Sequence, residues 1–326
     1  MGLMINGVWD ASASMIPLEG GRFVREPAAF RNVVSADGSS GFKAEAGRYH
    51  LYVAYHCPWA WRTILYRRLK RLENVISMTI AIPNDRREGW TFGDYPGGCA
   101  PDAVNGFTHL HQAYSAAKAG YSGTVSVPVL WDRATNTIVN NESPDIIRML
   151  NSAFDAFTDA DQDYYPRKLR AAIDEVNQRV YDGVNNGVYR VGLARSQEAY
   201  DEAFETLFAT LDWLDARLAT QRYLVGEQVT EADWRLLPTL LRFDLVYHTL
   251  FKCNQRTIAS YPQLSHYLRE LYQMPGVAET INLTHFMRGY YSIPQLNASG
   301  IIPREPKFHA EWLRTAHDRA RLPAAA

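Results

Sequence analysis

The run from Tyr49 to Ile82 constrains the fold more than any other part of the chain. Residues Tyr49–Tyr55 have the composition of a strand, and apolar residues then recur at helical spacing from Trp61 to Leu72. Val75–Ile82 is again β-branched and apolar. Such a strand–helix–strand unit implies a parallel pair of strands with a right-handed crossover. The first half of the chain is therefore predicted to be an α/β structure.

The segments after this unit predict how the sheet is completed. Pro83–Gly123 is rich in glycine, proline and polar residues, and its length indicates a functional insert or short helices. Val125–Asp132 and Thr137–Asn141 have the pattern of a hairpin, with Pro128 at the start of its first strand. A helix follows, for which Ser143 is the expected cap. The order β-α-β, long connection, β-β-α is that of a thioredoxin-like domain, in which the proline before the third strand is often cis.

Strand patterns largely stop after the polar linker Thr158–Asp163. One buried helix face is indicated by the spacing of Ala203, Phe204, Leu207, Phe208, Leu211, Leu214 and Leu218. Thr230–Asp233 resembles a capping box before another helix, and a further helix is expected to stop near Pro275. The second half is therefore predicted to be all-helical.

The length of 326 residues and a hydrophobic content of 47% favour two globular domains over one. We expect residues 1–157 to form the thioredoxin-like domain, with an N-terminal extension and the long insert 83–123. Residues 158–326 are expected to form the helical domain, with a C-terminal tail from Ser292 to Ala326 that wraps over the surface.

Charge and composition limit the possible partners. A formal net charge of -1 gives no electrostatic reason to expect binding to nucleic acid or to a membrane surface. The run Met1–Asp10 lacks the features of a signal peptide, and no later apolar run approaches the ~18 residues of a membrane span. Three cysteines, an odd number, favour a reducing compartment. A cytoplasmic location is therefore expected.

Cys57 is the candidate nucleophile because it stands where a strand ends and a helix begins. The unpaired N–H groups and the positive macrodipole of a first helical turn favour a thiolate there. Pro58 suits a first helical position, and Arg62 adds a positive charge one turn later. Cys99 and Cys253 do not open helices and are expected to be structural. Because Ala60 stands where a Cys-x-x-Cys motif would need its second cysteine, an external thiol would have to complete any redox cycle.

Several motifs in one order, spanning nearly the whole chain, resemble the Xi class of glutathione transferases, the glutathionyl-hydroquinone reductases. The motifs are Cys57-Pro58-Trp59-Ala60, Val127-Pro128-Val129-Leu130-Trp131-Asp132, Asn141-Glu142-Ser143, Asn186-Gly187-Val188-Tyr189, Arg242-Phe243-Asp244 with Tyr247, Phe251-Lys252-Cys253-Asn254, Tyr290-Tyr291 and Gly300-Ile301-Ile302-Pro303. The resemblance implies a thioredoxin-like domain followed by a helical glutathione-transferase domain, and a homodimer.

The resemblance also implies a reaction. The Cys57 thiolate would attack the sulfur that joins glutathione to a hydroquinone ring, and a second glutathione would release the resulting mixed disulfide as glutathione disulfide. Tyr189 would supply the proton that the aromatic carbon needs, while Tyr247 and Tyr290 would lie near the cysteine and help stabilise its thiolate. Glutathione is then the co-substrate. No metal or nucleotide is expected, because zinc-ligand spacings, a P-loop and a Gly-x-Gly-x-x-Gly motif are missing from the sequence.

Two segments are expected to bind glutathione. Glu142 would pair with the amine of the γ-glutamyl group, while Ser143 and the following helix N–H groups would receive its α-carboxylate. Thr124-Val125-Ser126-Val127-Pro128 would line the cysteinyl part, with the Val127 backbone pairing as an added strand does. Trp90, in the long insert, corresponds in the family to a glutathione contact. His56 is expected to be structural, since neighbouring side chains at a strand end point apart.

The chain departs from the family pattern at Trp61, where histidine is common, and at Thr124, where arginine is common. The first difference could reshape the substrate pocket, and the second would remove a cationic contact to glutathione. Two other functions stay open at this point. One is an Omega-like thioltransferase or dehydroascorbate reductase, and the other is a non-catalytic binding protein that keeps the fold.

Overall fold

The computed structural model describes residues 2–13, 17–84, 87–304 and 307–322. Contacts divide the chain into two units. The first comprises the described residues of Met1–Met15, Pro27–Gln162 and Thr280–Ile301, and the second those of Ile16–Glu26, Asp163–Glu279 and Ile302–Ala326.

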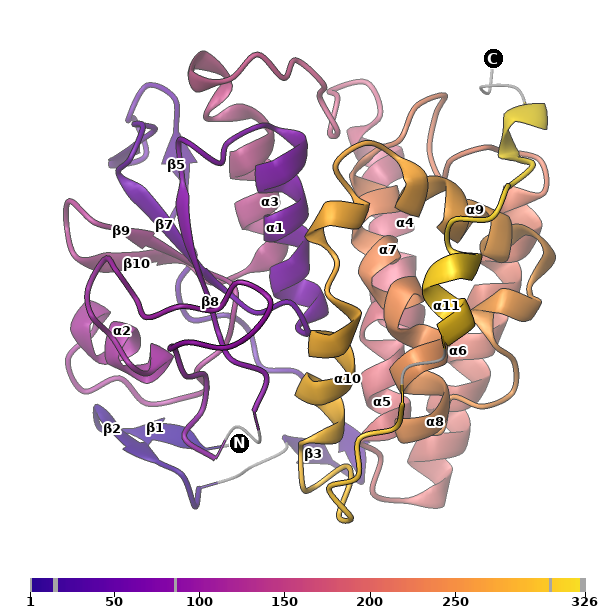
Figure 1. The fold of residues 1–326 in the computed structure, drawn as a ribbon, viewed down its shortest axis with the longest axis horizontal. Coiled ribbons are helices and arrows are strands. Elements are labelled where there is room, and N and C mark those ends of the chain that lie inside the picture. Colours follow the sequence, from indigo (N-terminus) through magenta and orange to yellow (C-terminus); the bar gives the residue numbers. More distant parts are fainter. Residues whose placement is uncertain (1, 14–16, 85–86, 305–306, 323–326) are drawn as a thin grey trace. The chain divides into compact units, whose positions relative to one another are not determined.

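A four-stranded mixed sheet organises the first unit (Figure 1). Strand β7 (Tyr49–Val53) pairs in parallel with β8 (Ser77–Ile80) and antiparallel with β9 (Val129–Asp132), which pairs with β10 (Thr137–Asn140). All five residues of β7 are buried, as befits an inner strand covered on both faces. The strand–helix–strand unit and the proline-led hairpin are thus present, and the predicted fold class is confirmed.

Helices α1 (Pro58–Leu69) and α3 (Ser143–Ser152) pack against each other beside this sheet (Figure 1). The long insert includes the eight-residue helix α2 (Leu110–Ala117), which packs against β10. Helix α10 (Leu283–Tyr291) also belongs to the first unit by its contacts. The unit also contains the short strands β1 (Leu3–Ile5), β2 (Val8–Asp10), β5 (Val34–Ser35) and β6 (Phe42–Lys43).

Helices form most of the second unit. They are α4 (Arg170–Val180), α5 (Gly187–Gly192), α6 (Gln197–Leu218), α7 (Glu231–Arg242), α8 (His248–Leu250), α9 (Pro262–Gln273) and α11 (Lys307–Trp312), with the short strands β3 (Leu18–Glu19) and β4 (Arg22–Phe23). The apolar stripe predicted on α6 is largely buried. Thr230 and Asp233 form the predicted capping box at the start of α7. Helix α9 ends just before Pro275, as expected.

The sequence predicts a single domain boundary after residue 157. The observed units do not follow it, because each unit includes segments that are distant in the sequence. Residues 17–26 count with the helical unit. Within that unit Arg22 forms ion pairs with Glu198 and Glu202 of α6. Residues 280–301, expected with the helical domain, count instead with the sheet.

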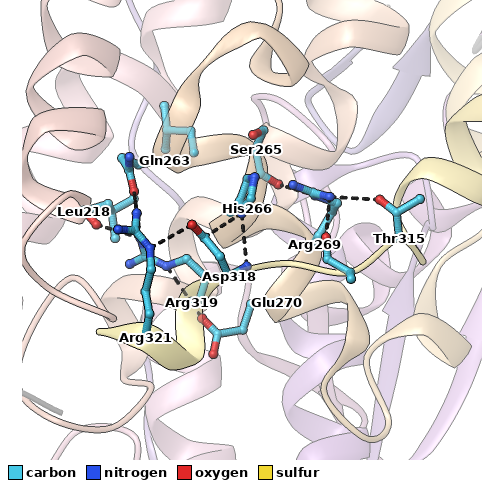
Figure 2. A network of polar contacts seen from close by, with 12 residues as sticks. Leu218, Gln263, Ser265, His266, Arg269, Glu270, Thr315, Asp318, Arg319 and Arg321 are labelled. Atoms are coloured by element: carbon cyan, nitrogen blue, oxygen red, sulfur yellow. Dashed lines mark hydrogen bonds and ion pairs between the residues drawn. The ribbon is translucent and has the colours of Figure 1, made fainter. Parts of the chain in front are cut away.

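The C-terminal tail does not simply lie over the surface, because it inserts a buried arginine (Figure 2). Arg319 is 0% exposed and donates to the carbonyl oxygens of Leu218, Gln221 and Arg222, just where α6 ends. Its guanidinium also lies 3.8 Å from the Glu270 carboxylate. A cation at the end of a helix complements the helix dipole. Arg269 and Gln273 of α9 donate to the Leu313, Thr315 and Ala316 carbonyls as well, so the last part of the tail is anchored into the helical unit by several hydrogen bonds.

None of the helices in the described ranges combines the length and the apolar character needed to span a lipid bilayer.

Candidate active site

Cys57 occupies the position that the sequence predicted, at the N-cap of α1 with Pro58 as the first helical residue. Its backbone is extended, and its carbonyl accepts the N–H of Trp61 at 2.9 Å. The side chain is 7% exposed, and its Sγ donates to the Val127 carbonyl at 3.6 Å. The Val127–Pro128 bond is cis, as expected. The sulfur therefore lies between the positive end of a helix and the segment before that proline.

Arg62 joins two of the predicted site segments. Its buried guanidinium donates from Nη1 to the Ser143 hydroxyl at 3.3 Å and lies 4.7 Å from the centre of the Trp59 ring. The sequence assigned this arginine to the neighbourhood of the thiolate. The structure shows it linking α1 to the first residue of α3, where it adds positive charge to a helix N-terminus.

The cap of α3 differs from the sequence prediction. Glu142, not Ser143, is the N-cap residue, and Ser143 already has its place in the first helical turn. The Glu142 N–H donates to the side-chain oxygen of Asn140 at 2.6 Å, which fixes the entry of the chain into the helix. Ser143 is buried and its hydroxyl accepts from Arg62, so it serves this contact rather than the cap. Glu142 and Ser143 still stand together at the start of α3.

Trp90 contacts the segment 124–128, which precedes and includes Pro128. Its indole N–H donates to the Val125 carbonyl at 3.1 Å, and its ring stacks on His56 with 5.3 Å between centroids. The side chain is buried. The contact of Trp90 with glutathione therefore stays a prediction, while its contact with the segment 124–128 is direct. His56 is fully buried against this ring.

The two positions that depart from the family pattern lie in different surroundings. Trp61 is fully buried, and its indole N–H donates to the Thr280 carbonyl at 2.8 Å. It thus ties α1 to the chain that leads into α10. Thr124 is half-buried, and its carbonyl accepts from the Tyr121 hydroxyl at 2.8 Å.

Helix α10 brings Tyr290 into the first unit, where this side chain is buried. The helix packs closely on the residue before the cysteine. A Cβ built on Gly289 would lie 2.1 Å from Cγ of His56, so only glycine allows this approach. Tyr290 is therefore held by an element that contacts the neighbour of Cys57.

Tyr189 and Tyr247 lie together within the second unit. Their ring centroids are 5.9 Å apart, and both rings pack against Phe251. Tyr247 is fully buried, whereas Tyr189 is half-buried. The sequence prediction missed Arg25, whose guanidinium lies 4.9 Å from the Tyr189 ring centre and donates to the side-chain oxygen of Asn186 at 2.9 Å. No local pattern marks this arginine, because it lies in an irregular segment more than 150 residues before its partners.

The other two cysteines, Cys99 and Cys253, are buried and do not stand at the start of a helix. Burial raises the pKa of the Cys99 thiol to about 11 and raises the pKa of the Cys253 thiol as well. Both are therefore protonated at neutral pH. Within the described ranges, no group of three or more His, Cys, Asp or Glu side chains is arranged to hold a metal ion.

Comparison with protein families gives two matches. Residues 56–153 match the N-terminal domain of glutathione S-transferases, and residues 197–270 match their C-terminal domain. The fold and these two matches define the chain as a glutathione S-transferase.

Individual relatives narrow this assignment. The chain is 49% identical over 308 residues to the glutathionyl-hydroquinone reductase PcpF of Sphingobium chlorophenolicum, a match that covers 94% of this chain and 96% of that protein. It is 49% identical over 313 residues to the glutathionyl-hydroquinone reductase YqjG of Escherichia coli (strain K12), covering 94% and 95%.

Solved structures agree with these relatives. The Xi-class glutathione transferase from Natrialba magadii superposes with a TM-score of 0.91 at 42% identity, covering 99% of this chain and 98% of that one. The glutathione-bound structure of YqjG gives a TM-score of 0.87 at 45% identity, with coverage of 97% and 99%. The chain belongs to the Xi class of glutathione S-transferases, the glutathionyl-hydroquinone reductases.

Proposed function

We propose that this protein is a glutathionyl-hydroquinone reductase, which uses glutathione to reduce glutathionyl-hydroquinones to hydroquinones. The observation that carries the proposal is the place of Cys57, at the start of α1 with its sulfur 3.6 Å from the Val127 carbonyl. A cysteine in this position takes glutathione onto its own sulfur, because the ligand's cysteinyl part pairs with the backbone beside it.

The reaction runs in two steps. The Cys57 thiolate attacks the glutathione sulfur of the thioether, so that an S–S bond forms and the bond between sulfur and the ring carbon breaks. The electron pair stays on that carbon, which takes a proton from the Tyr189 hydroxyl. A second glutathione, whose thiol proton restores the Tyr189 hydroxyl, then attacks the mixed disulfide as its thiolate, forming glutathione disulfide and returning the Cys57 thiolate. The substrate carbon is reduced and two glutathione sulfurs are oxidised.

Recognition of glutathione is assigned to the two segments beside the cysteine. Glu142 pairs with the γ-glutamyl amine, while Ser143 and the first-turn N–H groups of α3 receive the α-carboxylate, with Arg62 adding positive charge. The backbone of Val127 pairs with the cysteinyl part. Trp90 and residues 124–126 complete the assigned binding site. Tyr247 and Tyr290 are assigned to thiolate stabilisation in the substrate pocket.

The decisive assay follows release of hydroquinone from a glutathionyl-hydroquinone in the presence of glutathione. We expect turnover by the wild-type protein and by Cys99→Ala, a matched control for loss of a buried thiol, and only the background rate for Cys57→Ala. Activity that survives in Cys57→Ala would overturn the assignment of the nucleophile.

A second comparison separates this function from an Omega-like thioltransferase. Tyr189→Phe should slow cleavage of the thioether strongly but leave reduction of a small mixed disulfide unchanged, because only the first reaction protonates carbon. Tyr200→Phe is the control, since its hydroxyl bonds the Lys252 carbonyl in the same unit. Faster turnover of dehydroascorbate or a small disulfide than of the thioether by the wild-type protein would favour the Omega-like function instead.

A homodimer and a cytoplasmic location complete the proposal. The family resemblance supports the dimer, and the three free cysteines Cys57, Cys99 and Cys253 suit a reducing compartment. Analytical ultracentrifugation tests the dimer, and fractionation of the source cells tests the location.

A further inference from the structure

Three aromatic side chains of the long insert hold three consecutive carbonyl groups of the segment before Pro128. Each carbonyl accepts one hydrogen bond from a tyrosine hydroxyl or an indole N–H. The pairs are Tyr121 Oη to the Thr124 carbonyl at 2.8 Å, Trp90 Nε1 to the Val125 carbonyl at 3.1 Å and Tyr114 Oη to the Ser126 carbonyl at 2.9 Å. The insert therefore fixes this stretch of backbone residue by residue.

Tyr114 holds more than one group of this segment. Its side chain is 0% exposed, and its hydroxyl also accepts the N–H of Ser126 at 3.2 Å and the side-chain amide of Asn141 at 3.0 Å. One donated and two accepted bonds use the full capacity of a phenol. Burial raises the pKa of Tyr114, so the hydroxyl stays protonated and able to donate. A single oxygen thus holds both polar groups of the Ser126 backbone.

Asn141 carries this contact into the second predicted binding segment. Its side-chain oxygen accepts the N–H of Phe30 at 2.9 Å, and its own N–H donates to the Phe30 carbonyl at 3.1 Å. Asn141 directly precedes Glu142 and Ser143. The Tyr114 hydroxyl therefore links the segment 124–128 to the start of α3 through one intermediate side chain.

Fixing Ser126 determines what the next residue presents. Because Tyr114 occupies the N–H and the carbonyl of Ser126, the backbone of Val127 is what remains for a ligand in extended conformation. The Val127 carbonyl accepts from Sγ of Cys57. The backbone N–H of Val127 has no hydrogen-bond acceptor in the described part of the chain. Val127 is thus held in register beside the cysteine.

We propose that Tyr114 is a positioning residue for glutathione. Its hydroxyl sets the distance between the Val127 backbone and the Glu142–Ser143 pair, so that the cysteinyl and γ-glutamyl parts of one ligand molecule are recognised together. This inference rests on the proposed function. It assigns to the long insert the role of a rigid support for the binding segments.

The test compares Tyr114→Phe with Tyr49→Phe. Tyr49 is a matched control because it is equally buried and its hydroxyl donates to the Lys43 carbonyl, at the end of β7 remote from Cys57. Binding of S-methylglutathione is measured by calorimetry, and KM and kcat are measured with a glutathionyl-hydroquinone. Alkylation of Cys57 by iodoacetamide without ligand reports whether the thiol is intact.

Tyr114→Phe should weaken binding and raise KM by about tenfold or more, since it frees polar groups at two binding segments. Ligand-free alkylation should keep its wild-type rate, and Tyr49→Phe should bind as the wild type does. Equal affinity in the two variants would overturn the inference. Should Tyr114→Phe be insoluble, Asn141→Ser decides: weaker binding supports the inference, and unchanged binding overturns it.

The same experiment separates this inference from the proposed function. Wild-type binding and turnover, with unchanged affinity in Tyr114→Phe, would refute only the role of Tyr114. A wild-type protein that neither binds S-methylglutathione nor releases hydroquinone would refute the proposed function, and the inference with it.

Discussion

Replacement of Gly289 by alanine tests how closely α10 packs beside the reactive cysteine. An alanine Cβ at this position would lie 2.1 Å from Cγ, 2.4 Å from Cδ2 and 2.5 Å from Cβ of His56. All three separations are shorter than 3.0 Å, a distance below which Cβ contacts are essentially never found in proteins. The His56 ring is buried and stacked on Trp90, so it cannot simply rotate away.

The size of the effect follows from these distances. The helix and the ring must separate by more than 1 Å to restore ordinary contact, and overpacking of this kind costs about 1–3 kcal/mol. Alanine recovers about 1 kcal/mol relative to glycine inside a helix. Because the contact is very short, we take the upper end of the overpacking range, about 3 kcal/mol, and subtract the gain from alanine. Gly289→Ala should therefore lower the free energy of unfolding by about 2 kcal/mol. Catalytic turnover should fall too, because α10 holds Tyr290 and His56 precedes Cys57.

Urea denaturation followed by circular dichroism measures the change, with Gly187→Ala as the control. A Cβ on Gly187 would meet its nearest neighbour at 3.5 Å, an ordinary contact, so this variant should match or exceed wild-type stability. If both variants were equally stable, α10 would not pack against His56 as described, and the reasoning would be refuted.

Three further predictions concern other contacts. Arg62→Met should raise KM for glutathione about tenfold, because a charge-assisted bond to Ser143 is lost at the start of α3. Arg319→Met should destabilise the helical unit by about 3 kcal/mol in thermal unfolding, because buried carbonyls at the end of α6 lose their donor. Burial lowers the pKa of His50 from 6.5 to about 4. Between pH 6.5 and pH 4 only the unfolded state takes up the proton on His50. The free energy of unfolding therefore decreases as the pH is lowered, by about 2 kcal/mol at pH 5 relative to pH 7.

Each of these predictions has its own control. Arg71→Met removes an exposed ion pair with Asp159 and should leave KM unchanged. Arg321→Met, on the exposed side of the same tail, should change stability by less than about 0.5 kcal/mol. His50→Asn should flatten the pH dependence measured by urea unfolding. Equal effects in each variant and its control, or an unchanged pH dependence in His50→Asn, would contradict the corresponding explanation.

Local patterns were sufficient to predict the features that depend on neighbours in the chain. The strand-to-helix boundary placed Cys57 at the N-cap of α1, and the Thr230–Asp233 pattern predicted the capping box of α7. Both features arise from hydrogen bonds within one helical turn, which the sequence displays directly.

The features that the sequence did not predict depend on distant partners. Serine is a favoured residue type at helix caps, but the Ser143 hydroxyl accepts a hydrogen bond from Arg62, which lies 81 residues earlier. Arg319 has the appearance of a solvated tail residue, yet it is buried and donates to carbonyls at the end of α6, about a hundred residues before it. The contact of Arg25 with Tyr189 likewise crosses more than 150 residues. Such pairings are decided by tertiary packing, which local propensity does not record.

The most direct test of the account is the mass of the protein after one turnover. Stoichiometric glutathionyl-hydroquinone, mixed with the enzyme without free glutathione and quenched in acid, should leave one glutathionyl group on Cys57 and release one equivalent of hydroquinone. Cys57→Ser should show neither product. Release of hydroquinone from the wild-type protein without this adduct, or an adduct on Cys99 or Cys253 instead, would contradict the proposed cysteine chemistry.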